Sequence, residues 1–281
     1  MTDAGWRREG GARRLRPGIL VIGHGSREAV WVERVEAAVR EAAFLLRERT
    51  GAEVPVEAAY LELVEGRLIQ DGVDRLEALG VTDLLAVPFF ISSGSMHVRE
   101  IGWALGACDE PEGGTDLKPV RVGARLSYGR PMDDDPEIAE ALLDKIAPFS
   151  ADPAGEAVLL IGHGNAEPEL CRAWMRGMSG LAERVREHGG YAAADVALLA
   201  TDDPAEKAEA LRRGRPHLRV LAVPVFLSEG YFTAEAVPKR LRGAPCDYAE
   251  TALLPHPKLA EWIARQSAEW LARLERSGQP G

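Results

Sequence analysis

Gly18-Ile-Leu-Val-Ile-Gly-His-Gly-Ser26 is the stretch that decides the fold, and a close copy of it occurs later in the chain. It returns as Ala157-Val-Leu-Leu-Ile-Gly-His-Gly-Asn165, with five identities in nine positions. A second block, Leu84–Gly94, returns as Val220–Gly230 with seven identities in eleven positions. The offsets are 139 and 136 residues, so the two blocks keep their order and spacing. We therefore interpret the chain as a tandem duplication.

Strand-like and helix-like stretches alternate within each copy. Residues 18–22 form a continuous apolar run, which is typical of a strand buried on both faces of a parallel sheet. Apolar residues then recur at spacings of three and four through residues 32–46, which indicates a long amphipathic helix ending near Gly51. The sequence predicts an α/β fold of two tandem domains, each a parallel β-sheet flanked by helices. Further strands are expected near 54–61, 83–88 and 119–126, then 157–161, 194–200, 218–223 and 247–253, with helices near 67–79, 98–106 and 136–147.

The boundary between the copies is expected near Pro148–Gly155, where prolines and glycines interrupt the pattern. We expect one domain at residues 17–148, which carries the active site, and a degenerate copy at residues 155–275. Residues 1–17 contain five arginines against two acidic residues. Because this stretch has no apolar periodicity, residues 1–16 are interpreted as a disordered basic leader.

Composition excludes several classes of protein. The net charge of the 281 residues is −10, and residues 1–17 contribute +3, so the remainder carries −13 and is a poor partner for nucleic acid. No apolar run approaches the about 20 residues of a membrane-spanning helix, and the N-terminus lacks the apolar core of a signal peptide. The cysteines are far apart without a CxxC spacing, which argues against a disulfide framework and favours the cytoplasm.

Two histidines follow predicted strands, each in a glycine-bearing loop. His24 comes directly after the first strand, and His97 follows the 83–88 strand. Ligands bind at the carboxyl ends of parallel strands, so the two imidazoles are candidates for one cleft. Imidazole suits Fe, Co, Ni and Zn, and it accepts protons near pH 7. A histidine after a strand is also commonly a hydrogen-bonded structural residue, and spacing leaves the two interpretations open.

Two other interpretations of Gly-His-Gly-Ser find less support. A phosphate-binding loop would need more glycines and a following Gly-Lys-Ser or Gly-Lys-Thr, which the sequence does not supply. A hydrolase with Ser26 as nucleophile would need the Gly-x-Ser-x-Gly elbow, which is also missing.

Four motifs together resemble the CbiX/SirB family of sirohydrochlorin chelatases. They are Leu20–Ser26, Ala59-Tyr-Leu-Glu-Leu63, the Val-Pro-Phe-Phe that precedes Ser92-Ser-Gly94, and His97-Val98. The resemblance covers residues 17–270 as two chelatase-like domains. It implies ATP-independent insertion of Co²⁺ or Fe²⁺, as the substrate metal, into sirohydrochlorin on the way to cobalamin or sirohaem, with no organic cofactor.

The resemblance also implies roles for particular residues. The family's two metal-binding, proton-accepting histidines carry over onto His24 and His97. Family members commonly have Asp-Ile-Pro after the second histidine; here Glu100 stands in that stretch, and we count it as catalytic. Residues expected to bind the carboxylate-rich substrate are Ser26, Arg27, Ser93, Gly94, Ser95 and Arg99, and Arg125 and Lys239 are further candidate cations.

The second copy departs further from the family pattern. His163 matches His24, but the position of His97 is taken by Thr233, or by Phe232 if the register shifts by one. Tyr231 and Phe232 are candidates for covering a macrocycle or for apolar packing. We expect one working site, in the first copy, and a monomer whose halves pair as single-domain relatives do. The competing hypotheses are a metal or tetrapyrrole carrier without turnover, and a hydrolase using His24 and Ser26.

Overall fold

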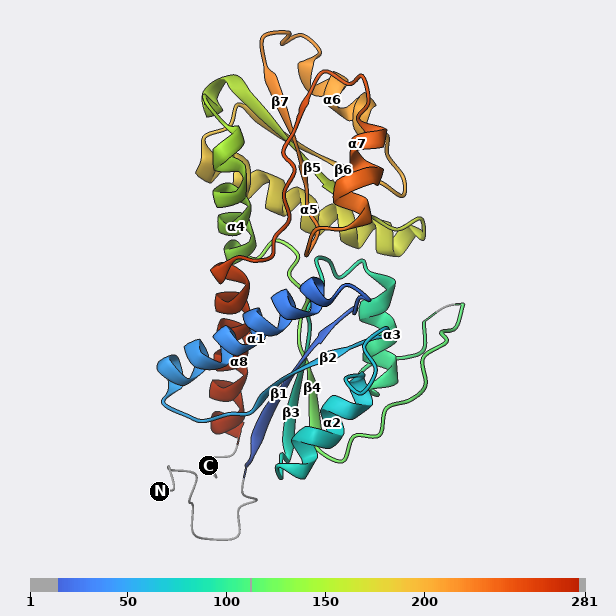
Figure 1. Cartoon of the computed structure of the whole chain (residues 1–281), viewed down its shortest axis with the longest axis vertical. Coiled ribbons are helices and arrows are strands. Elements are labelled where there is room, and N and C mark those ends of the chain that lie inside the picture. The colour runs from blue at the N-terminus through green and yellow to red at the C-terminus, as the bar shows by residue number, and fades with distance from the viewer. Residues whose placement is uncertain (1–14, 112, 278–281) are drawn as a thin grey trace. The chain divides into compact units, whose positions relative to one another are not determined.

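Two four-stranded parallel sheets, one in each copy, form the framework of the protein (Figure 1). The computed structural model describes residues 15–111 and 113–277. The strand orders are β2-β1-β3-β4 and β6-β5-β7-β8, so the two sheets have the same topology. This arrangement confirms the predicted fold class. The strands are β1 (Pro17–Gly23), β2 (Val56–Tyr60), β3 (Asp83–Pro88), β4 (Arg125–Tyr128), β5 (Glu156–Gly162), β6 (Ala193–Leu198), β7 (Arg219–Pro224) and β8 (Asp247–Tyr248).

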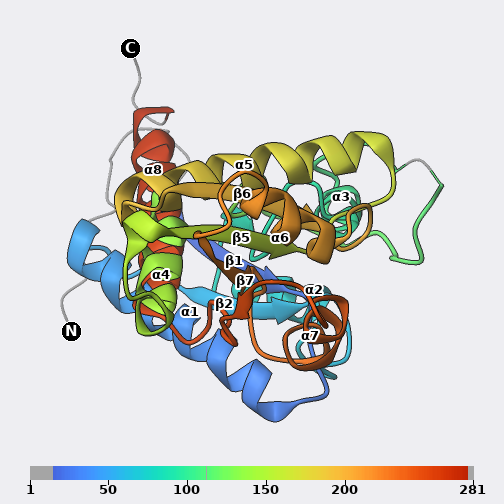
Figure 2. The same cartoon turned by 90° about the horizontal axis from the view of Figure 1, so that it is seen from above.

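Helices cover both faces of each sheet. The second strand of each copy lies on one side of the first strand and the third lies on the other side, so the right-handed connections place their helices on opposite faces. In Figure 1, α1 and α8 lie on one side of the first sheet, and α2 and α3 lie on the other. In the second sheet α5 runs beside β5 and β6 and packs against α4 (Figure 2). No helix of the described residues is long and apolar enough to cross a membrane. The helices are α1 (Ala29–Thr50), α2 (Ile69–Ala78), α3 (Met96–Ala104), α4 (Pro136–Ile146), α5 (Pro168–Gly189), α6 (Pro204–Arg212), α7 (Val237–Arg240) and α8 (Pro257–Ser277).

The contacts divide the chain into two compact units, and each unit contains more than one segment of the sequence. The first unit comprises the chain up to Phe89, Arg99–Arg130 and the chain from Ala260 onward. The second unit comprises Phe90–Val98 and Pro131–Leu259. Most of α8 therefore belongs to the first unit, and a short segment after β3 belongs to the second. The predicted basic leader, except for residues 15 and 16, lies outside the described residues.

The C-terminal helix α8 supplies core residues to the first unit. Trp262 is fully buried, and its ring centroid lies 6.0 Å from that of Phe89, which follows β3. The buried Gln266 accepts a hydrogen bond from the backbone N–H of Arg130 (2.6 Å) and donates one to the Arg130 carbonyl (3.1 Å). A buried amide that is satisfied on both sides fixes α8 in register against the end of β4.

The last strand of each sheet is shorter than the sequence pattern predicts. The predicted strand at 119–126 is wrong in position, since β4 begins only at Arg125. The backbone N–H groups of Gly123 and Ala124 donate instead to the Glu77 side chain of α2, at 2.6 and 3.0 Å. In the second sheet only Asp247 and Tyr248 of the predicted 247–253 strand pair with β7. In the first sheet, the backbone before β4 therefore bonds to the Glu77 carboxylate and not to the neighbouring strand.

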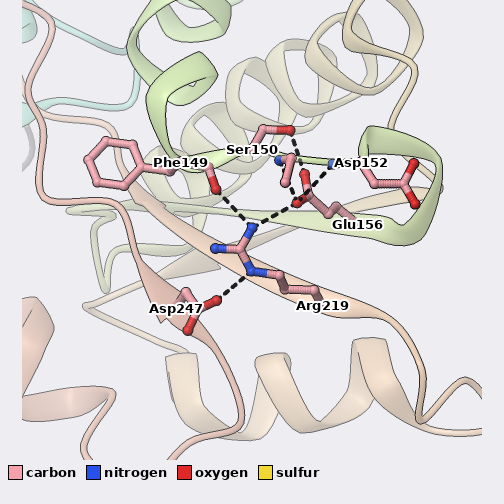
Figure 3. Close-up of polar contacts among 7 residues, drawn as sticks. Phe149, Ser150, Asp152, Glu156, Arg219 and Asp247 are labelled. Atoms are coloured by element: carbon pink, nitrogen blue, oxygen red, sulfur yellow. Dashed lines mark hydrogen bonds and ion pairs between the residues drawn. The ribbon is translucent and has the colours of Figure 1, made fainter.

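A buried carboxylate closes the amino edge of the second sheet. Glu156, the first residue of β5, is only 2% exposed, and it accepts hydrogen bonds from the backbone N–H of Ala151 and the Arg219 guanidinium (Figure 3). Arg219 also donates to the Asp247 carboxylate (2.6 Å) and to the Phe149 carbonyl (2.8 Å). Burial raises the pKa of Glu156, but these hydrogen bonds outweigh it and hold that pKa below its ordinary value.

The first sheet also has an ion pair with a buried carboxylate at its amino edge. Asp83 is fully buried at the start of β3, and Arg125 donates to it at 2.8 Å. Arg125, a candidate cation for the substrate, starts its strand and therefore lies at the opposite edge of the sheet from the Gly-His-Gly loop. The amino edges of both sheets are closed by ion pairs, which leaves the carboxyl edges for function.

His256 should make the stability of the protein depend on pH. Burial lowers the pKa of His256 below its ordinary value of 6.5, although Asp144, 3.3 Å away, raises it in part. The unfolded chain then binds a proton more readily than the folded chain, so stability falls as the pH drops through this range. We expect the melting temperature of the wild type to fall more between about pH 7.5 and about pH 5.5 than that of His256→Asn.

The asparagine keeps an acceptor for the backbone N–H of Lys258, which the His256 ring accepts at 3.3 Å. His217→Asn, at an exposed histidine, is the matched control and should follow the wild type. Equal pH dependence in His256→Asn and the wild type would contradict the assignment.

Candidate functional site

The Gly-His-Gly loop places His24 at the carboxyl edge of the first sheet. β1 ends at Gly23, and His24 is the next residue. Gly25 adopts a φ of +101°, a conformation that L side chains rarely adopt. A Cβ at Gly25 would lie 2.0 Å from the Glu62 carbonyl oxygen, so no other residue fits there without moving the backbone. The glycine allows the loop to turn tightly over the end of β2.

The His24 ring has a defined hydrogen-bonding state in this loop. Its Nδ1 lies 3.1 Å from the Gly25 carbonyl oxygen. Because a carbonyl only accepts, the neutral ring carries its proton on Nδ1 and keeps a lone pair on Nε2. That Nε2 lies 3.7 Å from Oε1 of Glu62, and both side chains are partly exposed. An imidazole nitrogen and a carboxylate oxygen thus lie side by side at the surface.

Glu62 was not among the predicted site residues, although it belongs to the quoted Leu61-Glu62-Leu63 motif. It follows β2, the strand next to β1, and two hydrogen bonds continue the ladder past both strand ends. The N–H of Leu61 donates to the Gly23 carbonyl (2.9 Å), and the N–H of Glu62 donates to the His24 carbonyl (3.1 Å). Glu62 could have been predicted from its position, because it is an acidic residue shortly after β2 and β2 neighbours β1, the strand that leads to His24.

His97 occupies the first turn of α3, after the loop that follows β3. β3 is paired with β1, and Pro88, the last residue of β3, lies opposite Ile22. The His97 ring lies 6.2 Å from that of Phe90, and both belong to the segment Phe90–Val98 of the second unit. Glu100 is one helical turn further on, on the same face of α3, and accepts a hydrogen bond from Thr115 Oγ1 at 3.1 Å.

Four other predicted site residues lie in two loops, one before α1 and one after β3. Ser26 Oγ accepts the backbone N–H of Glu28 (3.0 Å) just before α1, and Arg27 is exposed. In the loop after β3, Ser93 bonds to Asp133 (2.8 Å), and Gly94 packs tightly against Trp174. These two residues anchor the loop, and contacts between them and a substrate stay a prediction.

Ser95 and Arg99 are partly buried on either side of His97. The Ser95 N–H donates to the Ser92 carbonyl (3.0 Å), and the Arg99 carbonyl accepts from the Cys108 thiol (3.5 Å). Among residues 15–111 and 113–277, no group of three or more His, Cys, Asp or Glu side chains forms a ready-made metal cluster.

The second copy keeps the first histidine and has other residues at the positions of Glu62 and His97. His163 Nδ1 lies 2.9 Å from the Gly164 carbonyl, as in the first copy. The Ala200 N–H donates to the His163 carbonyl, so Ala200 holds the place that Glu62 holds in the first copy. Thr233 lies nine residues after the end of β7, as His97 does after β3. Thr233 is buried, and its hydroxyl bonds both polar backbone atoms of Gly230 at 3.0 Å.

A cavity of about 480 Å³ lies beside His163. The Phe232 ring meets the imidazole edge-on at 4.9 Å and stacks on Phe226 at 5.2 Å. Arg240 fixes the rim by donating to the Leu199 carbonyl (2.9 Å) and the Asp202 carbonyl (3.0 Å). The second copy therefore has an aromatic pocket in place of a second set of metal-ligating side chains.

The fold and the site define a duplicated α/β protein with a histidine loop at the carboxyl edge of each sheet. The family model CbiX matches residues 18–148 and again residues 157–270. The chain belongs to the CbiX family.

Relatives with assigned names agree with this membership. The chain is 29% identical to the sirohydrochlorin ferrochelatase of Bacillus subtilis over 175 residues, which are 62% of this chain and 59% of that protein. It is 31% identical to the sirohydrochlorin cobaltochelatase of Methanopyrus kandleri over 144 residues, 46% of this chain and 93% of that protein. The match therefore spans less than two thirds of the first relative and nearly all of the second.

Solved structures share the fold over the whole duplicated chain. The structure of SirB from Bacillus subtilis with Fe³⁺ superimposes with a TM-score of 0.64 at 22% identity, covering 93% of this chain and 98% of that one. SirB from the spizizenii subspecies of Bacillus subtilis in complex with cobalt gives a TM-score of 0.62 at 20% identity, covering 91% and 96%.

Proposed function

We propose that this protein is a sirohydrochlorin chelatase, which inserts Co²⁺ or Fe²⁺ into the tetrapyrrole without ATP. The observation that carries the proposal is the pair formed by His24 Nε2 and the Glu62 carboxylate, 3.7 Å apart. Metal bonds of about 2.0–2.2 Å to nitrogen and oxygen make this a spacing that one divalent ion can bridge. The named relatives act on sirohydrochlorin with iron or cobalt, which supports both the substrate and the metals.

His24 and His97 together supply what the reaction demands of the chain. Two pyrrole N–H protons must leave as the metal enters, and neutral imidazoles accept protons near pH 7. The His24 ring is oriented by the Gly25 carbonyl, 3.1 Å from Nδ1, and it acts through Nε2, first as a ligand and then as a base. His97 takes the corresponding role from α3, and Glu100, on the same face of that helix, receives a proton released at His97.

The carboxylates of the tetrapyrrole require cations and N–H or O–H donors near the site. Arg27, next to the Gly-His-Gly loop, and Arg99, on α3, are proposed for charge-assisted hydrogen bonds. Ser26 and Ser95 are proposed as neutral donors beside them. The chain carries a net charge of −10, so these local cations have to attract the substrate against the overall field.

We infer further that the protein acts as a monomer in the cytoplasm. Cys108, Cys171 and Cys246 are all free thiols in the structure, which fits a reducing compartment. Two copies of the fold in one chain provide internally what a dimer of single-domain relatives would provide.

The direct test is an absorbance assay with purified protein, sirohydrochlorin and Co²⁺ or, without oxygen, Fe²⁺. A rate well above the non-enzymatic one, with multiple turnovers and no ATP, is expected. Tight metal binding with no product beyond the background would instead identify a carrier and overturn the proposal.

Glu62→Gln is expected to weaken Co²⁺ binding by about tenfold or more, because the amide has lost the negative charge that faces His24 Nε2. Glu57→Gln, at a carboxylate of β2 that pairs with Arg75, is the matched control. Titration with Co²⁺, followed by its absorption, measures both variants. Equal affinity in Glu62→Gln and the wild type would remove Glu62 from the site.

A further inference from the structure

Residues from elsewhere in the second unit hold the loop between β3 and α3. Met132 and Asp133 bond to it, and the helix α5 packs against it. At the start of the loop, the backbone N–H groups of Met132 and Asp133 donate to the carbonyls of Phe90 and Ile91, at 2.9 and 2.8 Å. These bonds form a short ladder beyond the end of β4. The loop then continues for a few residues to His97, so its position determines where the His97 imidazole lies.

Asp133 adds a side-chain clamp to this ladder. Its Oδ1 accepts from the Ser93 backbone N–H (2.8 Å) and from the Ser93 hydroxyl (3.2 Å). Burial raises the pKa of Asp133, and the hydrogen bonds from Ser93 and Ser92 oppose that rise. Asp133 also has a φ of +43°, a conformation disfavoured for residues with a side chain. A strained backbone and a desolvated carboxylate persist only where the surrounding contacts hold them.

The helix α5 forms the platform on which this clamp rests. A Cβ at Gly177 of α5 would lie 2.8 Å from Asp133 Oδ1, so the glycine makes room for the carboxylate. Gly94 of the loop lies directly against the same helix, where a Cβ would come within 2.3 Å of the Leu170 carbonyl oxygen and 2.5 Å of the Trp174 ring. Trp174 is itself buried. The loop that carries His97 therefore sits on a helix whose sequence belongs to the second copy.

The second copy provides an internal comparison because it keeps the ladder and lacks the clamp. Leu253 and Leu254 donate to the carbonyls of Phe226 and Leu227, at 3.0 and 2.7 Å, so Leu254 takes the place of Asp133. The leucine side chain cannot accept a hydrogen bond, and the residue that corresponds to Ser93 is Glu229. At Gly230, which corresponds to Gly94, a Cβ would meet nothing within 4 Å among the described residues. The clamp exists only in the copy whose loop carries a second histidine.

We infer that Asp133 is a positioning residue for His97 and that α5 is the platform that holds the metal-binding loop in place. This inference rests on the proposed function. It gives a role to a second copy that lacks a complete set of metal ligands, since that copy supplies the helix on which the His97 loop is seated.

The test combines Asp133→Ala with the histidine variants. Asp133→Ala should weaken Co²⁺ binding and slow chelation by about tenfold or more, as expected on removing a group that orients a ligand. Asp133→Asn keeps an oxygen acceptor for the Ser93 N–H and should restore most of both. In a His97→Ala background, Asp133→Ala should cause no further loss, whereas in a His24→Ala background it should.

Two matched controls separate positioning from general damage. Asp134→Ala removes the neighbouring carboxylate, which pairs with Arg184 of α5 at 3.3 Å, and should bind Co²⁺ like the wild type. Gly94→Ala should displace the loop and reproduce the Asp133→Ala defect, whereas Gly230→Ala should not. If Asp133→Ala fails to fold, the comparison of Gly94→Ala with Gly230→Ala still tests whether the position of the loop controls Co²⁺ binding.

The outcomes distinguish the inference from the function on which it rests. If His97→Ala itself leaves Co²⁺ binding and chelation unchanged, the proposed metal site is wrong and the positioning role falls with it. If His97→Ala is defective but Asp133→Ala and Gly94→Ala are not, only the positioning role is wrong. An equal loss from Asp133→Ala with and without His97 would likewise overturn it.

Discussion

His24→Ala and His97→Ala are each expected to slow Co²⁺ insertion into sirohydrochlorin by at least about 100-fold, because each removes a metal ligand and a proton acceptor together. The His24 ring is already oriented by the Gly25 carbonyl, with its Nε2 facing the Glu62 carboxylate at 3.7 Å. Alanine leaves the Glu62 carboxylate without its imidazole neighbour. The measurement is kcat/KM from the absorbance change, corrected for the non-enzymatic rate.

The second copy supplies the control for this prediction. His163 has the same ring geometry as His24, with Nδ1 2.9 Å from its own glycine carbonyl, but Ala200 and Thr233 replace the other two groups. His163→Ala should therefore leave the rate unchanged. If His163→Ala abolishes the reaction while His97→Ala does not, the working site lies in the second copy and the assignment is wrong.

Gly25→Ala is expected to destabilise the protein by about 2–5 kcal/mol and to abolish chelation, because a methyl group there combines a disfavoured φ with overpacking. The new Cβ would lie 2.0 Å from the Glu62 carbonyl oxygen, so the loops after β1 and β2 must separate. That movement breaks the hydrogen bond from the Glu62 N–H to the His24 carbonyl, now 3.1 Å, and parts the two proposed ligands. Urea unfolding gives the stability, and Co²⁺ titration gives the state of the site.

Gly51→Ala isolates the contribution of backbone strain alone. Gly51 caps α1 with a φ of +68° and has nothing within 4 Å of its Cβ position among the described residues. Its replacement should cost only about 1–2 kcal/mol and leave Co²⁺ affinity intact. A Gly25→Ala protein as stable as Gly51→Ala and fully active would show that the loop accommodates a side chain.

The repeat and the buried strands could be predicted from the sequence because they are local patterns. The apolar run before Gly-His-Gly identifies β1, and its copy identifies β5 with the same topology. The last strand of the first sheet could not be placed, since the backbone N–H groups of Gly123 and Ala124 bond to the Glu77 side chain of α2, 46 and 47 residues away in sequence. Hydrophobic patterning does not reveal such side-chain competitors for a backbone donor.

Some residues of the candidate site could likewise be predicted from local patterns, and others could not. His24 at a strand end followed from the pattern, and Glu62 would have followed from the order of the strands, which sets β2 beside β1. The edge at which Arg125 lies could not be predicted, because it depends on where β4 begins. The bond between Ser93 and Asp133 joins residues 40 positions apart, and no spacing rule reaches that far.

The place of α8 in the first unit bears on how the protein is made. Trp262 and Gln266 of α8 complete a core that begins at β1, so that core stays open until α8 has left the ribosome. Until then the apolar surface that Trp262 will cover is exposed to water and to other chains. A stop codon near residue 250 should therefore yield aggregates in which the amino-terminal Gly-His-Gly loop is intact in sequence but has no finished sheet to support it.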